Sequence, residues 1–375
     1  MIKRDIQKII EQYFFKGKII IIYGARQVGK TTLVRAVEDK YSKESIYFNC
    51  DEPDIRDKFT NVTSTQLEML VRAYNIIIID EAQRIKNVGL TLKLLIDNFP
   101  EKQIIATGSS AFELSNLISE PLTGRKFTFQ LFPFSLMELQ QKYSLLEINR
   151  LLENRIIYGM YPDIVKHPEN PEFLLKELIN SYLFKDILQY HNIKHPELLE
   201  KLLAALALQI GNQVSYNELA GLINISKETV ASYIQLLEKS YVIFRLSSFS
   251  RNIRNELKRS KKIYFVDTGL RNALIRNYNP LYLRQDTGAL WENFIISERL
   301  KYNQANMQFP NTYFWRTHQQ QEIDYIEEIG GKLYAYEFKW QAKKKGKIPK
   351  VFINAYPDSE TKTVNIENYM EFILT

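Results

Sequence analysis

The 375-residue chain is too long for one hydrophobic core of usual size, so its length predicts about two to four domains. A composition of 45% apolar and 25% charged residues is that of soluble globular protein, and a single cysteine, Cys50, excludes an intrachain disulfide framework. The net charge of +7 favours polyanionic partners without identifying one. The polar N-terminal segment is unlike a signal peptide, and no apolar run reaches the ~20 residues of a membrane helix, so we expect a cytoplasmic protein.

The first chemical motif is GARQVGKTT, which follows the β-forming residues 19–23 and precedes an apolar helical pattern. It has the form GxxxxGK[ST] of a phosphate-binding loop, and these flanks favour that interpretation over an ordinary glycine-rich turn. Backbone N–H groups surround a β-phosphate, the Lys30 ammonium adds charge, and the Thr31 hydroxyl can bind Mg²⁺. The sequence therefore predicts binding of ATP and Mg²⁺ by Gly24, Ala25, Arg26, Gln27, Val28, Gly29, Lys30, Thr31 and Thr32.

A second motif ends the apolar run of residues 75–81 with two carboxylates, Asp80 and Glu81. Apolar strands of this kind are typical of parallel sheets, whose C-terminal edges bind ligands. Asp80 is therefore predicted to hold Mg²⁺ through water, and Glu81 to orient and polarise the attacking water. The alternative is a pair of solvated residues at the end of a strand.

Two further candidates for the ATPase site follow along the chain. In P-loop ATPases with an extra strand between the phosphate loop and the acidic strand, a polar residue after that strand reaches the γ-phosphate or the lytic water. We assign this role to Ser109, after the strand predicted at 103–107, with Thr107 as the second candidate. Arg125 precedes the next predicted strand and is expected to enter the nucleotide site of a neighbouring subunit. A rim salt bridge is the alternative for Arg125.

These motifs also occur in a recognisable order. The series GARQVGKT, IIIIDEAQ, TGSS, LTGRKFTFQLFPFS and YGMYPDIV resembles that of prokaryotic AAA+/STAND-like ATPases with a C-terminal domain of long-unknown function. The resemblance extends from about residue 3 to the C-terminus, and it implies an AAA+-type fold and a homo-oligomer, such as a hexameric ring, assembled through the nucleotide site. It also implies a contact of Pro162 and its neighbours with adenine. The family usually has a second glycine where this chain has Met160, and without the family the segment is a turn between helices.

Residues 135–197 have apolar side chains at helical spacing and are predicted to form a helical lid. Arg155 is the nearest candidate for a lid arginine that contacts the γ-phosphate, but the sequence favours a solvated helix charge over that role.

The middle of the chain, residues 198–278, predicts a winged helix. Ser215 and Ser226 open two short helices separated by a turn, and two strands flanking a basic loop follow. The predicted recognition helix offers no arginine for reading bases, so we expect contacts to the DNA backbone rather than sequence readout. The alternative is a lid or a docking site for a partner. The basic loop would supply the phosphate contacts through Arg251, Arg254, Lys258 and Arg259, with Lys261 and Lys262 adding charge.

The C-terminal part, residues 279–375, contains a helix bearing Glu292, then Asp324, then a hairpin that leads to Glu337 and Lys339. This layout is that of PD-(D/E)xK nucleases, and the C-terminal domain of the family is similar to them. Pairing of the two strands would bring both strand carboxylates together. Asp324 and Glu337 are then predicted to bind Mg²⁺, Glu292 to complete the set, and Lys339 to orient water or stabilise the oxyanion. The alternative is a nuclease fold kept as a scaffold or sensor.

The sequence therefore predicts an α/β protein with a P-loop AAA+-type core (1–134), a helical lid (135–197), a winged helix (198–278) and a nuclease-like domain (279–375). The leading hypothesis is an ATP-hydrolysing, DNA-binding protein with a metal-dependent nuclease that acts on branched or structured DNA. One alternative is a STAND-type signalling or defence switch whose nuclease-like domain only binds a partner. A DNA-binding regulator without C-terminal chemistry is another.

Overall fold

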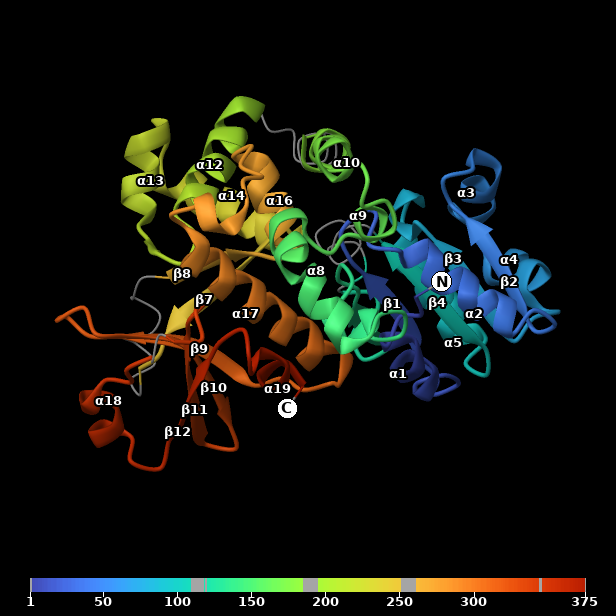
Figure 1. Ribbon diagram of the computed structural model, residues 1–375. Coiled ribbons are helices and arrows are strands. Elements are labelled where there is room, and N and C mark those ends of the chain that lie inside the picture. The colour runs from blue at the N-terminus through green and yellow to red at the C-terminus, as the bar shows by residue number, and fades with distance from the viewer. Residues whose placement is uncertain are drawn as a thin grey trace. The chain divides into compact units, whose positions relative to one another are not determined.

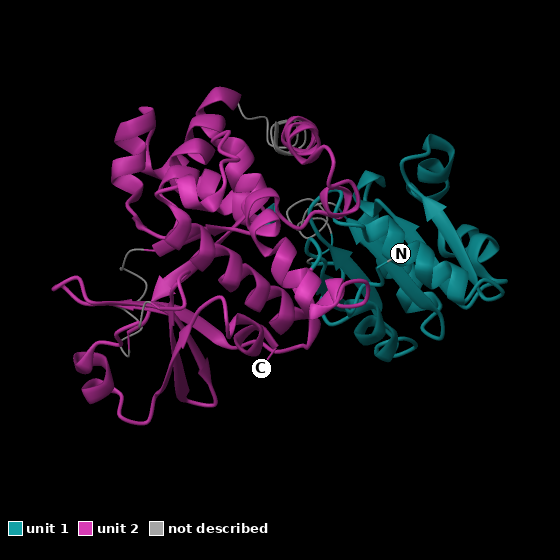
Figure 2. Ribbon diagram, in the orientation of Figure 1, with its two compact units in different colours: residues 1–134, 239–241 teal, residues 135–238, 242–375 magenta. Residues whose placement is uncertain are grey.

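The computed structural model (Figure 1) describes residues 2–108, 118, 120–184, 195–250, 261–343 and 346–374. The chain divides into two compact units (Figure 2), of which unit 1 comprises residues 1–134 with 239–241, and unit 2 comprises residues 135–238 with 242–375. Each unit contains one sheet.

Unit 1 is built on a five-stranded sheet in the order β2-β3-β4-β1-β5, in which every pairing is parallel. Its strands are β1 (Ile19–Tyr23), β2 (Ser45–Asn49), β3 (Ile76–Asp80), β4 (Gln103–Gly108) and β5 (Lys126–Gln130). Its helices are α1 (Ile6–Gln12), α2 (Lys30–Lys40), α3 (Pro53–Phe59), α4 (Ser64–Val71), the short η1 (Ala82–Arg84) and α5 (Val88–Asn98).

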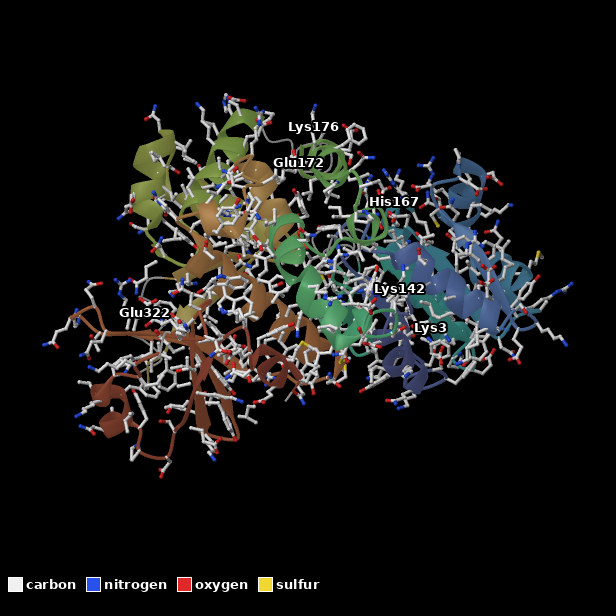
Figure 3. All side chains as sticks on the ribbon, viewed as in Figure 1. Lys3, Lys142, His167, Glu172, Lys176 and Glu322 are labelled. Atoms are coloured by element: carbon white, nitrogen blue, oxygen red, sulfur yellow. The ribbon has the colours of Figure 1, made fainter. Side chains whose placement is uncertain are left out.

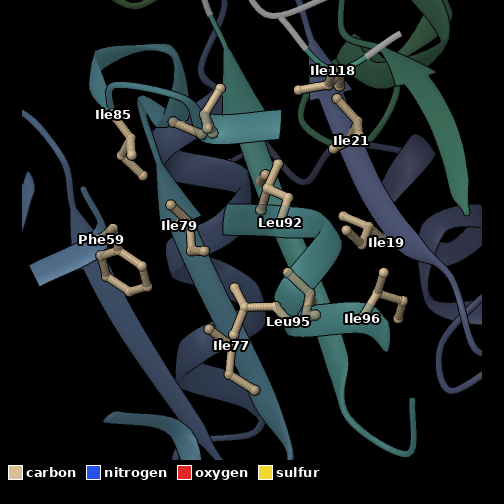
Figure 4. Close-up of a cluster of buried hydrophobic side chains, with 14 of the residues drawn as sticks. Ile19, Ile21, Phe59, Ile77, Ile79, Ile85, Leu92, Leu95, Ile96 and Ile118 are labelled. Carbon is tan, nitrogen blue, oxygen red and sulfur yellow. The ribbon is translucent and has the colours of Figure 1, made fainter. Parts of the chain in front are cut away.

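The core of unit 1 explains why its apolar strands form where they do. Every residue of β1 and β3 is buried, as expected for central parallel strands with helices on both faces. Side chains of β3 such as Ile77 and Ile79 pack with Leu92 and Leu95 of α5 (Figure 4). Strand β4 lies between β1 and β3, so the expected extra strand is confirmed. All strands present their C-terminal ends at one edge, where the phosphate loop also lies.

Unit 2 is built on a seven-stranded sheet in the order β12-β11-β10-β9-β7-β8-β6. Its strands are β6 (Gln213–Val214), β7 (Ile243–Ser248), β8 (Lys261–Phe265), β9 (Asn311–Arg316), β10 (Glu322–Ile329), β11 (Lys332–Phe338) and β12 (Glu360–Val364). Its first helices are α7 (Leu136–Leu139), α8 (Leu145–Tyr158), α9 (Pro162–Lys166), α10 (Pro171–Leu178), the π-helix Ile179–Phe184 and α12 (Pro196–Leu208). The later ones are α13 (Tyr216–Ile223), α14 (Lys227–Lys239), α16 (Thr268–Leu274), η3 (Leu281–Leu283), α17 (Thr287–Ala305), α18 (Lys350–Ala355) and α19 (Tyr369–Leu374).

Unit 2 has two short helices and an antiparallel strand pair in the segment predicted as a winged helix, which stays a prediction. The Ser215 hydroxyl accepts the Glu218 N–H at the start of α13, and the Ser226 hydroxyl accepts the Thr229 N–H near the start of α14. Asn224 ends α13 in a left-handed conformation with φ 55°, which an asparagine tolerates well. Strands β7 and β8 then pair antiparallel.

The sheet of unit 2 crosses the boundary that the sequence placed at residue 278. Strand β7 pairs in parallel with β9, which joins the hairpin to the C-terminal strands. Helix α17 contacts strands from both parts of this sheet. The Asn293 amide accepts the Phe265 N–H at 2.8 Å and donates to the Phe265 carbonyl at 2.7 Å, while Arg299 makes a paired contact with Glu327 of β10 at 2.8 and 2.7 Å. The segments on either side of residue 278 therefore form one folded body.

No helix in the described ranges combines the length and the apolar character that crossing a membrane requires.

Candidate functional site

The phosphate loop lies between β1 and α2 with its backbone held in a special conformation. Gly29, with φ 95°, and Gln27, with φ 60°, are both left-handed, and only the glycine adopts this conformation without strain. Gly24 passes so close to the Leu131 carbonyl that an added Cβ would lie 2.3 Å from its oxygen. The Lys30 ammonium donates to the carbonyls of Gly24 and Ala25, at 2.9 Å each. The first and last parts of the loop are thereby tied together around the position expected for a phosphate.

Arg4 is a part of this site that the sequence motifs did not reveal. The residue is 8% exposed, and its guanidinium donates to the Val28 carbonyl in the loop at 2.6 Å and to the Phe132 carbonyl at 2.7 Å. One planar cation therefore fixes the loop to the segment that follows β5. No local pattern marks an isolated N-terminal arginine for this role, because its partners are 24 and 128 residues away.

Asp80, at the end of β3, receives hydrogen bonds from three hydroxyl groups. Its Oδ2 accepts from the Thr31 hydroxyl at 2.7 Å and from the Tyr47 hydroxyl at 2.6 Å, and its Oδ1 accepts from the Thr107 hydroxyl. Burial and the hydrogen bond to Asp80 raise the pKa of Tyr47, so the phenol stays a donor. The two residues predicted to bind Mg²⁺, Thr31 and Asp80, are thus adjacent.

Glu81 lies at the sheet edge with a left-handed backbone, φ 54°. Its N–H donates to the Thr107 hydroxyl at 3.0 Å, and its carboxylate accepts from the Gln83 amide at 2.6 Å. Thr107 therefore bridges the two acidic residues of the motif, because its hydroxyl also donates to Asp80. Ser109, the first choice for contacting the γ-phosphate, lies outside the described residues.

The oxygen donors at this edge fit Mg²⁺, which prefers carboxylate and hydroxyl ligands together with water. When bound with ATP, the ion would supply charge neutralisation at the β- and γ-phosphates. Thr31 would contribute a ligand, Asp80 would hold the hydration shell, and Glu81 would accept a proton from water.

Arg125 lies immediately before β5, at the opposite end of the sheet from the loop. The register pairs Ile19 with Lys126 and Tyr23 with Gln130, so about 17 Å of strand separates Arg125 from the loop in the same chain. The Arg125 guanidinium forms a salt bridge with Asp97 at 2.7 Å, and both side chains are partly exposed. This bridge is the alternative expected for Arg125, and it leaves the role in trans as a prediction.

The turn before Pro162 lies between α8 and α9, and Pro162 is the first residue of α9. Gly159 has φ 81°, and an added Cβ would lie 2.0 Å from Oδ1 of Asp267. The other oxygen of this carboxylate, Oδ2, accepts the Met160 N–H at 2.7 Å. A structural reason for a glycine at this turn is therefore present, and the adenine contact stays a prediction. Arg155 is 5% exposed, so the solvated alternative for this arginine is wrong.

In unit 2, the hairpin of β10 and β11 brings together the predicted nuclease residues. The antiparallel register pairs Tyr325 with Tyr336, which sets Asp324 opposite Glu337 one step further along. Oδ2 of Asp324 accepts the Phe338 N–H at 2.8 Å, and the Lys339 ammonium lies 2.5 Å from Oε1 of Glu337. The other carboxylate oxygen of Glu337 is buried and has no hydrogen-bond partner in the described part of the chain.

The electrostatics of this group reflect burial and like charge. Burial and the nearby Glu337 carboxylate raise the pKa of Asp324 to about 6. Burial raises the pKa of Glu337 as well, although Lys339 opposes this. Burial also raises the pKa of Glu292 to about 7, despite the adjacent Lys262. Carboxyl groups in this state take up a cation or a proton readily, which is the property that a metal site requires.

Glu292 and Lys262 differ from what the sequence predicted. Lys262, expected to add charge to an exposed loop, is 1% exposed, and its ammonium lies 2.9 Å from Oε1 of Glu292 and 2.5 Å from Oε1 of Glu322. Glu322 projects from β10 (Figure 3). Glu292 also accepts from the Tyr264 hydroxyl at 2.5 Å, so one of its oxygens has two donors in place of a metal. The usual alternation of buried and exposed residues along a strand could not predict the burial of Lys262, because Lys262, Ile263 and Tyr264 are all buried in β8.

The donor set therefore fits a metal only in part. Asp324 and Glu337 lie side by side with an unpaired buried oxygen, which fits Mg²⁺, whereas Glu292 is already neutralised by Lys262. Among the residues that the structure describes, no group of three or more His, Cys, Asp or Glu side chains is arranged to hold a metal ion. The predicted DNA contacts at Arg251, Arg254, Lys258 and Arg259 lie outside the described residues.

Three family models match successive parts of the chain. Residues 16–140 match the model of an AAA domain, 149–281 that of a domain of unknown function (DUF8612), and 287–370 that of a second such domain (DUF4143). Unit 1 is therefore the α/β core of an AAA-type P-loop ATPase.

Full-length relatives are similar over most of the chain. An uncharacterized protein of Mycobacterium tuberculosis is 28% identical over 347 residues, which cover 90% of this chain and 74% of the relative. An uncharacterized protein of Methanocaldococcus jannaschii is 26% identical, covering 78% and 69%. Among solved structures, a Walker-type ATPase of Pyrococcus abyssi gives a TM-score of 0.49 at 16% identity over 72% of this chain and 94% of its own, which is too low to assign a shared fold.

Proposed function

We propose that this protein hydrolyses ATP and uses a metal-dependent nuclease site in unit 2 to cleave branched or structured DNA. The ATP-hydrolysing part is supported by the AAA-domain match and by the contact between Thr31 and Asp80 at the edge of a parallel sheet. The observation that carries the nuclease part is the opposition of Asp324 and Glu337, with Lys339 beside them. Homo-oligomer assembly and DNA binding through residues 250–262 belong to the same proposal.

The residues of unit 2 have the chemistry that phosphodiester cleavage needs. A bound Mg²⁺ would supply an activated water and shield the phosphate charge. Asp324 and Glu337 would hold the ion, and the buried oxygen of Glu337, which has no partner among the described residues, favours such a ligand. The Lys339 ammonium, only partly exposed, would orient water or stabilise charge on the phosphate oxygens once it leaves Glu337. The alternative is a purely structural role, in which Lys339 only forms its present ion pair with the Glu337 carboxylate.

A second candidate is an ATP-driven switch whose unit 2 binds a partner without cleaving DNA. The observation that favours it is the occupation of Glu292 and Glu322 by the Lys262 ammonium, since a cluster neutralised by its own lysine is stable without any metal. The two candidates make different predictions for the same purified protein.

The deciding experiment incubates labelled linear, forked and four-way DNA with the protein, Mg²⁺ or Mn²⁺, and with or without ATP. The nuclease proposal expects cleavage by the wild type, loss of cleavage in Asp324→Asn and Lys339→Ala, and unchanged ATP hydrolysis in both. Glu328→Gln changes a residue of the same strand whose side chain contacts exposed Asn311, and this matched control should cleave normally. Cleavage that persists in Asp324→Asn, or that is absent from the wild type under every condition, would contradict the nuclease proposal. The ATP-driven switch would then be the remaining candidate.

A further inference from the structure

Lys262 is the most deeply buried lysine among the described residues, and its surroundings are acidic. Its side chain is 1% exposed and makes ion pairs with Glu292 and Glu322. The Tyr264 hydroxyl donates to the same oxygen of Glu292, and the ammonium lies 5.5 Å from the centre of the Phe314 ring. A lysine is rarely buried without paired acids, so the site is built to keep a positive charge there.

We propose that the Lys262 ammonium is the resident cation of this carboxylate cluster and occupies the place of a second divalent ion. The cluster then binds one metal ion, between Asp324 and Glu337, while Glu292 and Glu322 make ion pairs with the lysine. This inference rests on the proposed metal site in unit 2. It assigns a role to a residue outside the nuclease-like motif, because Lys262 lies on β8, 30 residues before Glu292 in the sequence.

The distribution of charges supports a division into two halves. In one half, Lys262 makes ion pairs with Glu292 and Glu322, and Arg316 lies 3.3 Å from the other carboxylate oxygen of Glu322. In the other half, Lys339 contacts only one oxygen of Glu337, whose second oxygen is buried without a partner in the described residues. The first half has cations for its carboxylates. Among the described residues, the second half, which includes Asp324, has more negative charge than its lysine neutralises.

Direct competition explains why a lysine would exclude a second ion. A divalent ion bound by Glu292 would need the oxygen that already accepts from Lys262 and Tyr264. It would also have to enter beside a buried positive charge, which repels it strongly at low dielectric. Burial alone would lower the pKa of Lys262, but Glu292 and Glu322 outweigh it and raise the pKa, so the ammonium keeps its charge.

The test counts bound Mn²⁺ by titration calorimetry and electron paramagnetic resonance in nucleotide-free protein. Sites that Asp324→Asn or Glu292→Gln removes are assigned to unit 2. We expect about one such Mn²⁺ per wild-type chain, and about two in Lys262→Met, as in sites that use two metal ions. Adding Glu292→Gln to Lys262→Met should remove the extra ion. Lys261→Met, the neighbouring and more exposed lysine, should bind as the wild type does.

The outcomes separate this inference from the proposed function. A folded Lys262→Met protein that binds no more Mn²⁺ than the wild type overturns the inference and leaves the single metal site untouched. A wild type without any Mn²⁺ in unit 2, together with a Lys262→Met protein that gains one through Glu292, supports the resident cation and removes the proposed nuclease site.

Loss of folding in Lys262→Met is also informative. If the variant unfolds in EDTA and Mn²⁺ restores its circular dichroism and thermal transition, a divalent ion has replaced the ammonium, as the inference expects. If Mn²⁺ fails to restore it while Lys262→Arg folds normally, the residue is only structural and the inference is wrong.

Discussion

The Thr31 hydroxyl donates a 2.7 Å hydrogen bond to Oδ2 of Asp80, although the two residues are 49 positions apart in the sequence. The bond connects the start of α2 to the end of β3, and these are the two elements whose polar groups are predicted to accommodate a nucleotide-bound Mg²⁺. Glu81 follows directly and is held by Thr107 and Gln83. We therefore predict that nucleotide binding and hydrolysis depend on different side chains at this edge of the sheet.

The first prediction separates these two steps. Lys30→Ala should lose nucleotide binding, because the loop loses the charge that contacts the phosphates. Glu81→Gln should bind ATP as the wild type does and hydrolyse it at least 100-fold more slowly, within the range of about 10²–10⁴ for general base catalysis. Fluorescent-nucleotide binding and phosphate release measure the two steps. Equal binding by wild type and Lys30→Ala would contradict the assignment of the loop.

The residues that sequence analysis placed correctly are those connected by local geometry. Asp80 and Glu81 end an apolar strand, and Asp324 and Glu337 are joined by a hairpin with Gly330 at its turn, so strand period and turn were enough to bring them together. These placements needed no knowledge of distant parts of the chain. The catalytic roles assigned to them stay predictions.

The residues that it missed depend on tertiary contacts. Arg4 reaches Phe132 across 128 positions, Tyr47 reaches Asp80 across 33, and Lys262 reaches Glu292 across 30. Each of these side chains is polar and would look solvated in its own segment, because no motif or period records a partner so far away. Lys262 also sits at the end of a basic run, which favoured an exposed loop over a buried ion pair.

The second prediction concerns Arg4, which joins the phosphate loop to the segment after β5. Arg4→Met keeps much of the side-chain volume but leaves the Val28 and Phe132 carbonyls without the guanidinium. A charged hydrogen bond contributes about 1.5–3 kcal/mol, so ATP should bind roughly tenfold more weakly or worse as the loop loses its fixed shape. Lys8→Met, an exposed residue of α1, is the control. Unchanged ATP affinity in a folded Arg4→Met protein would limit Arg4 to a structural role.

The third prediction tests Arg125 against its salt bridge with Asp97. If the arginine acts in a neighbour's site, Arg125→Ala should lower hydrolysis by about 10³-fold or more, whereas Asp97→Ala should leave it nearly intact. Mixing Arg125→Ala with Lys30→Ala subunits should restore part of the activity at mixed interfaces. Equal, small effects of both variants on hydrolysis, with no recovery in verified mixed oligomers, would show that the pair is only a rim salt bridge.

The last prediction concerns acid stability and rests on Asp286, just before α17. Burial alone would raise the pKa of Asp286, but hydrogen bonds and charges from Arg284 and Arg271 outweigh it and hold the pKa at about 2. A carboxyl whose folded pKa is depressed stabilises the fold above its unfolded pKa, 3.8, and loses that contribution as the pH falls toward 2.

The free energy of unfolding should therefore fall by about 1 kcal/mol through this group between pH 5 and pH 3, while the other carboxyl groups contribute equally to wild type and variant. Asp286→Asn removes the ionisable group and also leaves the buried Arg271 without its 2.5 Å partner, so the variant should be less stable at neutral pH. Urea unfolding at pH 7, 5, 4 and 3 measures the difference between the two proteins. The difference should narrow as the pH falls below 5, and a constant difference would mean that Asp286 is not held ionised by the two arginines.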